Sequence, residues 1–223
     1  SQWAADSALK DYQSPPEKIH IIPYGANMDK VPTNEEAIQK QGFSPCRFLF
    51  LGLDWVRKGG DMVFKTFEIL QQKGYDVHLT VCGCIPPPQY QNPKMTVIPF
   101  LNKNIESEEK RLFQILSETH FLFVPSRSDC TPIVFCEANA FGIPVITTNA
   151  GGIASVIEDG FNGHTLSLDA NPEDYAIALN PYFKDPELYK QLVKNSRDAY
   201  NSKLNWDHWG RSLAQIIEQL TNK

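Results

Sequence analysis

Two carboxylates, Asp129 and Glu137, stand eight positions apart in this chain of 223 residues. Carboxylates accept hydrogen bonds from hydroxyl groups, so such a pair suits a ligand that carries several hydroxyls. Two adjacent cations, Arg57 and Lys58, precede Gly59-Gly60, and cations beside glycines suit a phosphate that approaches the backbone. These side chains can act together only if the fold brings them to one place.

The carboxylates lie in a segment that predicts a strand, a loop, a helix and a second strand. The apolar runs Phe121–Val124 and 143–146 predict the two buried strands. Between them we predict a helix with Thr131 as its N-cap, Pro132 in its first position and Gly142 just past its end. A helix N-terminus at the carboxyl end of a buried strand is a place where an anionic group can bind.

The same alternation of apolar runs and helical patterns extends over most of the chain. The predicted strands are 48–52, 77–81, 95–98, 120–124, 143–147 and 163–168, with further helices opening at 58–60 and spanning 106–117. Alternating elements predict an α/β fold, a parallel sheet with helices on both faces. Three C-terminal helices are predicted at 172–183, 186–203 and 205–220.

The first part of the chain is less regular. We predict a helix over 1–12, a short strand over 18–25 and a polar linker over 27–42. The chain is therefore expected to begin within a longer protein.

In an open parallel sheet the ligand lies beyond the carboxyl ends of the strands, where loops and helix N-termini converge. The loops that follow predicted strands are 53–60, the loop after Cys82, 99–104, 126–131 and 148–153. They contain Lys58, Asp129 and Gly151-Gly152, and Glu137 lies about one and a half helical turns from Thr131, so it can face the same cleft. A ligand with phosphates and hydroxyls, such as a nucleotide sugar, fits this mixture better than a bare nucleotide.

Each of these residues also has an ordinary structural interpretation. Lys58 alone would be a solvated surface charge, Asp129 alone a helix-capping carboxylate, and Gly151-Gly152 a turn. Glu137 is harder to explain in this way, because an unpaired carboxylate buried in a helix is costly. The placement of all four on one rim favours a binding site.

Composition excludes several classes of function. With a formal charge of −5 and scattered Lys and Arg, the chain has no basic patch for nucleic acid, and no apolar run reaches the roughly 20 residues of a membrane span. Five cysteines favour reduced thiols over disulfides, and Cys82-Gly83-Cys84 lacks the second pair that a zinc site needs. We expect a soluble, cytoplasmic domain without a metal site.

Together these motifs resemble the signature of retaining glycosyltransferases of family 4 (glycosyl transferases group 1), which have the GT-B fold of two Rossmann-like domains. The resemblance covers nearly the whole chain and rests on 129–146, Gly151-Gly152, 158–160, 162–163, the phosphate loop 52–59 and the interdomain segment 23–27. It implies an enzyme that moves a sugar from a nucleoside diphosphate sugar to an unknown acceptor with retention of configuration, without a metal or other cofactor.

The resemblance also implies roles for single residues. Lys58 would stabilise the leaving diphosphate, Glu137 would hold ribose hydroxyls and Asp129 would bind hydroxyls of the donor sugar, which makes them the expected catalytic residues. Backbone N–H groups of the helix would meet sugar or phosphate oxygens, and the backbone near Phe100 would contact the base. The expected donor-binding residues are Gly52, Arg57, Pro99, Phe100, Leu101, Thr131, Pro132, Ile133 and Val134.

The family's two-domain architecture implies a division of the chain. Residues 1–28 would be the remnant of an N-terminal domain with the interdomain linker, 29–204 the Rossmann-like donor-binding domain, and 205–223 a crossing helix. The chain's partner would be its own N-terminal, acceptor-binding domain, and the isolated chain would transfer no sugar.

Three residues depart from the family pattern. Asp129 is one methylene shorter than the usual Glu, Leu53 stands where many members carry Arg, and Pro132 replaces a frequent Gly and removes an N–H. These departures leave open a non-catalytic nucleotide-binding or interaction module that kept the fold. A related GT-B enzyme, such as a nucleotide-sugar epimerase or a phosphorylase, is a third possibility.

Overall fold

A six-stranded sheet forms the centre of the computed structural model, which describes residues 1–39 and 42–221. The strands are β1 (Cys46–Leu51), β2 (Val77–Cys82), β3 (Met95–Ile98), β4 (Phe121–Phe123), β5 (Val145–Thr148) and β6 (Gly163–Leu166). They lie in the order β3-β2-β1-β4-β5-β6, and every neighbouring pair is parallel. The predicted parallel sheet is confirmed, and no strand end differs from the prediction by more than two residues.

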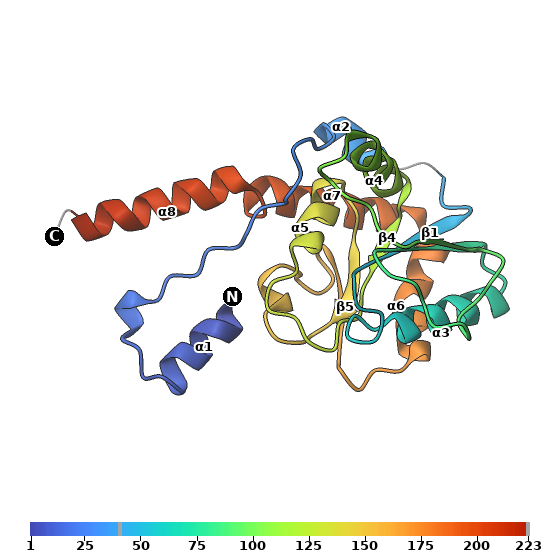
Figure 1. Ribbon diagram of the computed structural model, residues 1–223, viewed down its shortest axis with the longest axis horizontal. Helices are drawn as coiled ribbons and strands as arrows, with labels where there is room; N and C mark the ends of the chain where they lie inside the picture. Colours follow the sequence, from blue (N-terminus) through green and yellow to red (C-terminus); the bar gives the residue numbers. More distant parts are fainter. Residues whose placement is uncertain (40–41, 222–223) are drawn as a thin grey trace.

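Helices cover both faces of this sheet, as predicted (Figure 1). One apolar cluster joins the sheet to α4 (Glu106–Glu118) and α5 (Ile133–Ala140), and the other joins it to α3 (Gly60–Gln72) and α6 (Pro172–Lys184). The helix α7 (Pro186–Ser202) contributes to both clusters. Because both faces are buried, β1 is apolar from Phe48 onward, with Phe48 and Phe50 in one cluster and Leu49 in the other.

The first part of the chain corrects one prediction. It contains α1 (Gln2–Lys10), the 3₁₀ turn η1 (Pro16–Lys18) and α2 (Asn34–Ile38), but no strand over 18–25. That segment lies away from the sheet edges, so its backbone has no neighbouring strand to pair with, and it is held by other contacts. The Ala26 N–H donates to the Leu204 carbonyl at 3.1 Å, and Gly25 packs against Trp206. The predicted linker 27–42 includes α2, and its residues 40–41 lie outside the described residues.

The last helix, α8 (Trp206–Thr221), extends away from the sheet, and α1 lies on the same side of the molecule (Figure 1). None of its residues is buried, and Trp206, Ile217 and Leu220 are among its exposed apolar side chains. No helix of the described chain has the length and apolar character needed to cross a membrane.

Candidate functional site

The ion pair between Lys58 and Asp129 lies at the point where the strand order of the sheet reverses. Sequence order reverses at β1, which pairs with β2 on one side and β4 on the other, and in open α/β sheets the ligand crevice lies at such a point. Lys58 belongs to the loop after β1 and Asp129 to the loop after β4. The Lys58 Nζ contacts Asp129 Oδ2, and the two side chains are only 12% and 13% exposed. The solvated-charge and helix-cap interpretations are therefore wrong.

Two arginines lock these loops together. Arg57 donates from Nη1 to the Ser128 carbonyl at 3.1 Å, and the Arg127 N–H donates to the Arg57 carbonyl at 2.8 Å. The Arg127 guanidinium also binds the Asp61 carboxylate at 2.8 Å, and this hydrogen bond raises the pKa of Arg127. Sequence reasoning missed Arg127, whose signal was its place in the loop 126–131 that follows a predicted strand. Arg57, an expected donor-binding residue, is already engaged with the backbone.

Glycines make room for Lys58. A Cβ on Gly52 would lie 3.1 Å from Lys58 Cγ, so the lysine stem passes directly over this residue. Gly59 has a φ of +75°, and a Cβ there would lie 2.2 Å from the Pro125 carbonyl oxygen. The lysine is thus packed closely against Gly52, and Gly59 beside it has no room for a side chain.

Glu137 is almost completely buried in α5, with 1% of its surface exposed. Its Oε1 accepts from Lys103 Nζ, while Oε2 has no hydrogen-bond partner among the described residues. Burial raises the pKa of Glu137, and the positive charge of Lys103 opposes that rise. Lys103, which also donates to the Asn27 carbonyl at 3.3 Å, was not predicted, because a lysine in a polar loop has no pattern that marks it.

A cleft of about 150 Å³ lies beside Glu137, at the carboxyl ends of β1 and β2. Lys103 lines this cleft, together with five of the expected site residues: Gly52, Phe100, Leu101, Val134 and Glu137. The cleft thus combines an apolar wall with one buried carboxylate, which suits a flat ring that carries hydroxyl groups.

The helix α5 begins one residue later than predicted. Pro132 is its N-cap, with an extended backbone at φ −75° and ψ 106°, and the Thr131 hydroxyl bonds to the neighbouring Cys130 carbonyl at 2.7 Å instead of capping the helix. No side chain caps α5, so the N–H groups of Ile133 and Val134 have no partner within the helix. Ile133 is 36% exposed, and Pro99 is exposed outside the lining of the cleft.

Gly151 and Gly152 hold the loop that carries Asp129. The Gly152 N–H donates to the Asp129 carbonyl at 3.0 Å, and a Cβ on Gly152 would lie 1.6 Å from the Cys130 carbonyl oxygen. These glycines therefore do more than form a turn, because they let two backbone segments meet.

Residues 34–199 match the family described as glycosyl transferases group 1. The chain belongs to this family. Among curated members, it is 22% identical to D-inositol 3-phosphate glycosyltransferase of Corynebacterium kroppenstedtii over 98% of this chain and 52% of that protein. It is 36% identical to spore coat protein SA of Bacillus subtilis over 39% of this chain and 23% of that protein. The chain therefore spans about half, or less, of the length of these relatives.

Solved structures of glycosyltransferases show the same fold. The glycosyltransferase from Rickettsia africae superposes with a TM-score of 0.74 at 17% identity, over 100% of this chain and 63% of its own. HepE from Anabaena, solved with UDP-glucose, gives a TM-score of 0.70 at 16% identity, over 100% of this chain and 62% of its own. The fold of this chain is thus the Rossmann-like half of a GT-B architecture.

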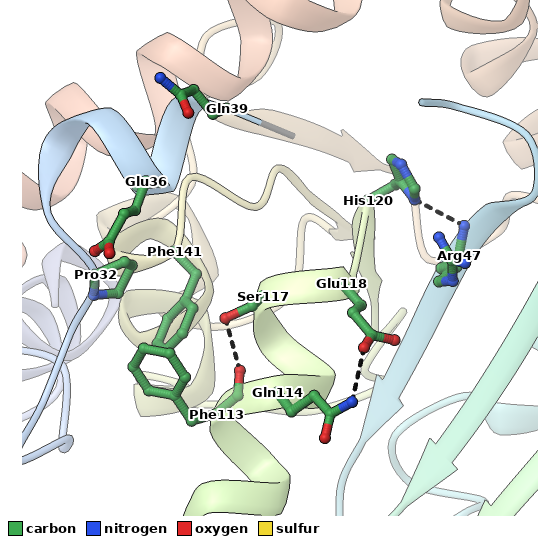
Figure 2. Close-up of a pocket in the computed structure, with 11 residues that line it drawn as sticks. Pro32, Glu36, Gln39, Arg47, Phe113, Gln114, Ser117, Glu118, His120 and Phe141 are labelled. Atoms are coloured by element: carbon green, nitrogen blue, oxygen red, sulfur yellow. Dashed lines mark hydrogen bonds between the residues drawn. The ribbon is translucent and has the colours of Figure 1, made fainter. Parts of the chain in front are cut away.

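A larger cavity of about 370 Å³ lies at the other end of the central strands, beside their amino ends (Figure 2). Arg47 at the start of β1 and His120 just before β4 line it, and the Arg47 N–H donates to His120 Nδ1 at 3.0 Å. It contains none of the expected site residues and lies at the amino ends of the strands, away from the carboxyl ends where open α/β sheets bind their ligands.

The cysteines are free thiols, as expected. Cys46, Cys82 and Cys136 are buried, and burial raises the pKa of Cys82 to about 11. Over residues 1–39 and 42–221, no group of three or more His, Cys, Asp and Glu side chains is arranged to hold a metal ion.

Proposed function

We propose that this chain is the donor-binding half of a retaining glycosyltransferase, which moves a sugar from a nucleoside diphosphate sugar to an acceptor held by an N-terminal domain. The observation that carries the proposal is the Lys58–Asp129 pair at the switch point, next to a cleft that ends on the buried Glu137. Membership of the group 1 family supports transfer chemistry, and the likeness to HepE, solved with UDP-glucose, supports a nucleotide-sugar donor.

The nucleoside would occupy the cleft. Phe100 and Leu101 would flank the base, and the partnerless Oε2 of Glu137 would accept a hydrogen bond from a ribose hydroxyl. A buried acceptor without a partner is costly, so a ligand that satisfies it gains affinity and selectivity for a ribose with free hydroxyls.

The diphosphate would lie between Lys58 and the start of α5. As the bond from the sugar to the diphosphate breaks, negative charge grows on the leaving oxygen, and Lys58 with the N–H groups of Ile133 and Val134 would stabilise it. Asp129 would exchange its contact with Lys58 for hydroxyls of the sugar. Because the chain itself supplies these groups, we expect the reaction to need no metal ion.

Nucleotide titration tests the binding half of this proposal. We expect the chain to bind UDP, GDP or ADP in calorimetry, and Lys58→Ala to weaken binding about tenfold or more, because it removes a cation and leaves Asp129 unpaired. Lys65→Ala is the matched control, since Lys65 is exposed on α3. Binding of no nucleotide, or equal binding by Lys58→Ala, would favour the non-catalytic interaction module instead.

The transfer itself requires the full-length protein. We expect its product to keep the anomeric configuration of the donor, and the isolated chain to transfer nothing; an epimerised sugar or a sugar phosphate would identify the related GT-B reactions. Reduced thiols suit a reducing compartment such as the cytoplasm, which is where we place the reaction.

A further inference from the structure

We propose that Lys103 is a positioning residue of the donor site, which orients the Glu137 carboxylate and links it to the connecting segment, residues 23–27, at Asn27. This inference rests on the proposed function, because the ligand of Glu137 is taken to be the ribose of the donor.

Lys103 donates two hydrogen bonds, one to Glu137 and one to the connecting segment. Its Nζ donates to Glu137 Oε1 and to the Asn27 carbonyl at 3.3 Å. The lysine side chain is 36% exposed and that of Glu137 only 2%, so a partly solvated ammonium holds a buried carboxylate. With Oε1 fixed in this way, Oε2 is the oxygen that remains without a partner for a ligand hydroxyl.

Lys103 also provides a positive charge that favours the ionised form of Glu137. Among the described residues that line the cleft, the titratable side chains are Cys82, Lys103 and Glu137, and the thiol of Cys136 adjoins Glu137 along the helix. Burial raises the pKa of both thiols, so they are neutral near pH 7. Lys103 is therefore the cation in the cleft that lowers the pKa of Glu137 against the effect of burial. The Asn27 backbone lowers this pKa as well.

The connecting segment is also held by other contacts. Cys136 donates from Sγ to the Tyr24 carbonyl at 3.4 Å, and Ala26 bonds to Leu204 at the end of α7. Lys103 adds a contact from the mouth of the cleft. A ligand that tightens Glu137 should consequently reduce the mobility of Asn27 through this lysine.

Binding measurements on lysine variants test the role in orientation. The probes are the nucleoside diphosphate that wild type binds among UDP, GDP and ADP, and its 2′,3′-dideoxy analogue. Lys103→Met should weaken the ribonucleotide about tenfold and leave the weaker dideoxy analogue unchanged, because only the former uses Glu137. Lys103→Arg should restore most of the affinity. Lys110→Met, which alters an exposed lysine paired with Glu106, should change neither ligand.

The pH dependence separates this role from a structural one. Ribonucleotide affinity of wild type should fall as the pH drops through the pKa of Glu137. In Lys103→Met the fall should begin at a higher pH, because the carboxylate has lost the cation that opposes burial. The dideoxy analogue should show no such step. Hydrogen exchange of residues 23–28 should slow when nucleotide binds to wild type and not when it binds to Lys103→Met.

Three results are contrary. Equal affinity and pH profile of Lys103→Met and wild type overturn the inference, and so does an equal loss for the ribonucleotide and the dideoxy analogue. Unchanged exchange of residues 23–28 in wild type removes the link to the connecting segment. If wild type binds no nucleoside diphosphate, the proposed function itself fails.

Discussion

At the scale of single residues, the burial of Glu137 costs stability at a position that suits the binding of a ligand. The chain buries a carboxylate, provides one cation for it and leaves one of its oxygens without a partner. Isolated buried charges destabilise a fold, so the residue is best explained by a ligand that completes its hydrogen bonds.

Glu137→Gln should therefore raise stability and weaken binding. The pKa of Glu137 is raised in the folded protein. Its contribution to the stability of the wild type is therefore fully present below the ordinary pKa of glutamate, and this contribution is lost as the pH rises through the folded pKa. The variant should unfold at a higher temperature than wild type at about pH 7.5, and the difference between the two unfolding temperatures should shrink at about pH 4. Thermal unfolding at both pH values checks this. A lower midpoint of the variant near neutrality would mean that the Lys103 pair outweighs the cost of burial.

At the scale of elements, the short turn η2 (Ile153–Ser155) and the loop before α5 support each other. Gly152 sits against the Cys130 carbonyl without space for a methyl group, although its φ of −91° is open to any residue. The position of Asp129 therefore depends on the absence of a side chain in another loop.

Gly152→Ala should disturb the site mainly through this contact, since the nearest side-chain atom, Ser1 Oγ, would lie farther from the new Cβ, at 2.7 Å. The added methyl must push the 129–130 backbone away, which we expect to cost about 1–3 kcal/mol and to weaken nucleotide-sugar binding more than nucleotide binding. Gly210→Ala is the control, because a Cβ on that helical glycine meets nothing within 4 Å. Denaturant unfolding and calorimetry measure both effects, and a Gly152→Ala protein with unchanged stability would show that the two loops separate freely.

The periodic elements could be predicted from the sequence because each carries its own pattern. Runs such as Phe48–Leu51 predict strands in any surroundings, and the expectation that Lys58 and Asp129 lie close together is confirmed by their ion pair. The strand predicted over 18–25 does not form because this segment has no neighbouring strand to pair with. The helix α5 begins later than predicted because the backbone of Pro132 is extended. Lys103 and Arg127 were missed because their partners, Glu137 and Asp61, are distant in sequence.

At the scale of the whole molecule, stability resides in the two clusters on either face of the sheet, and α8 adds no buried residue. The start of the helix still contacts the connecting segment, since the rings of Tyr24 and Trp206 lie 6.1 Å apart. The remainder projects from the body of the protein (Figure 1).

A chain that ends after Gly210 should keep its stability. We expect its unfolding midpoint to lie within about 2 °C of that of the full chain, whereas Leu204→Ala, which truncates a fully buried side chain, should lower it clearly. Circular dichroism during heating makes the comparison. A large loss on truncation would show that α8 supports the sheet through contacts other than burial.

The Lys58–Asp129 ion pair determines what an approaching ligand encounters. In this pair the positive charge is already matched by a carboxylate, on a chain whose formal net charge is −5. Long-range attraction for polyanions is correspondingly small. On the proposed function, inorganic pyrophosphate would separate the pair only by leaving Asp129 without a partner, whereas a donor would bring sugar hydroxyls that replace the lysine. The pair would then act as a filter, in which the sugar frees Lys58 to bind the phosphates.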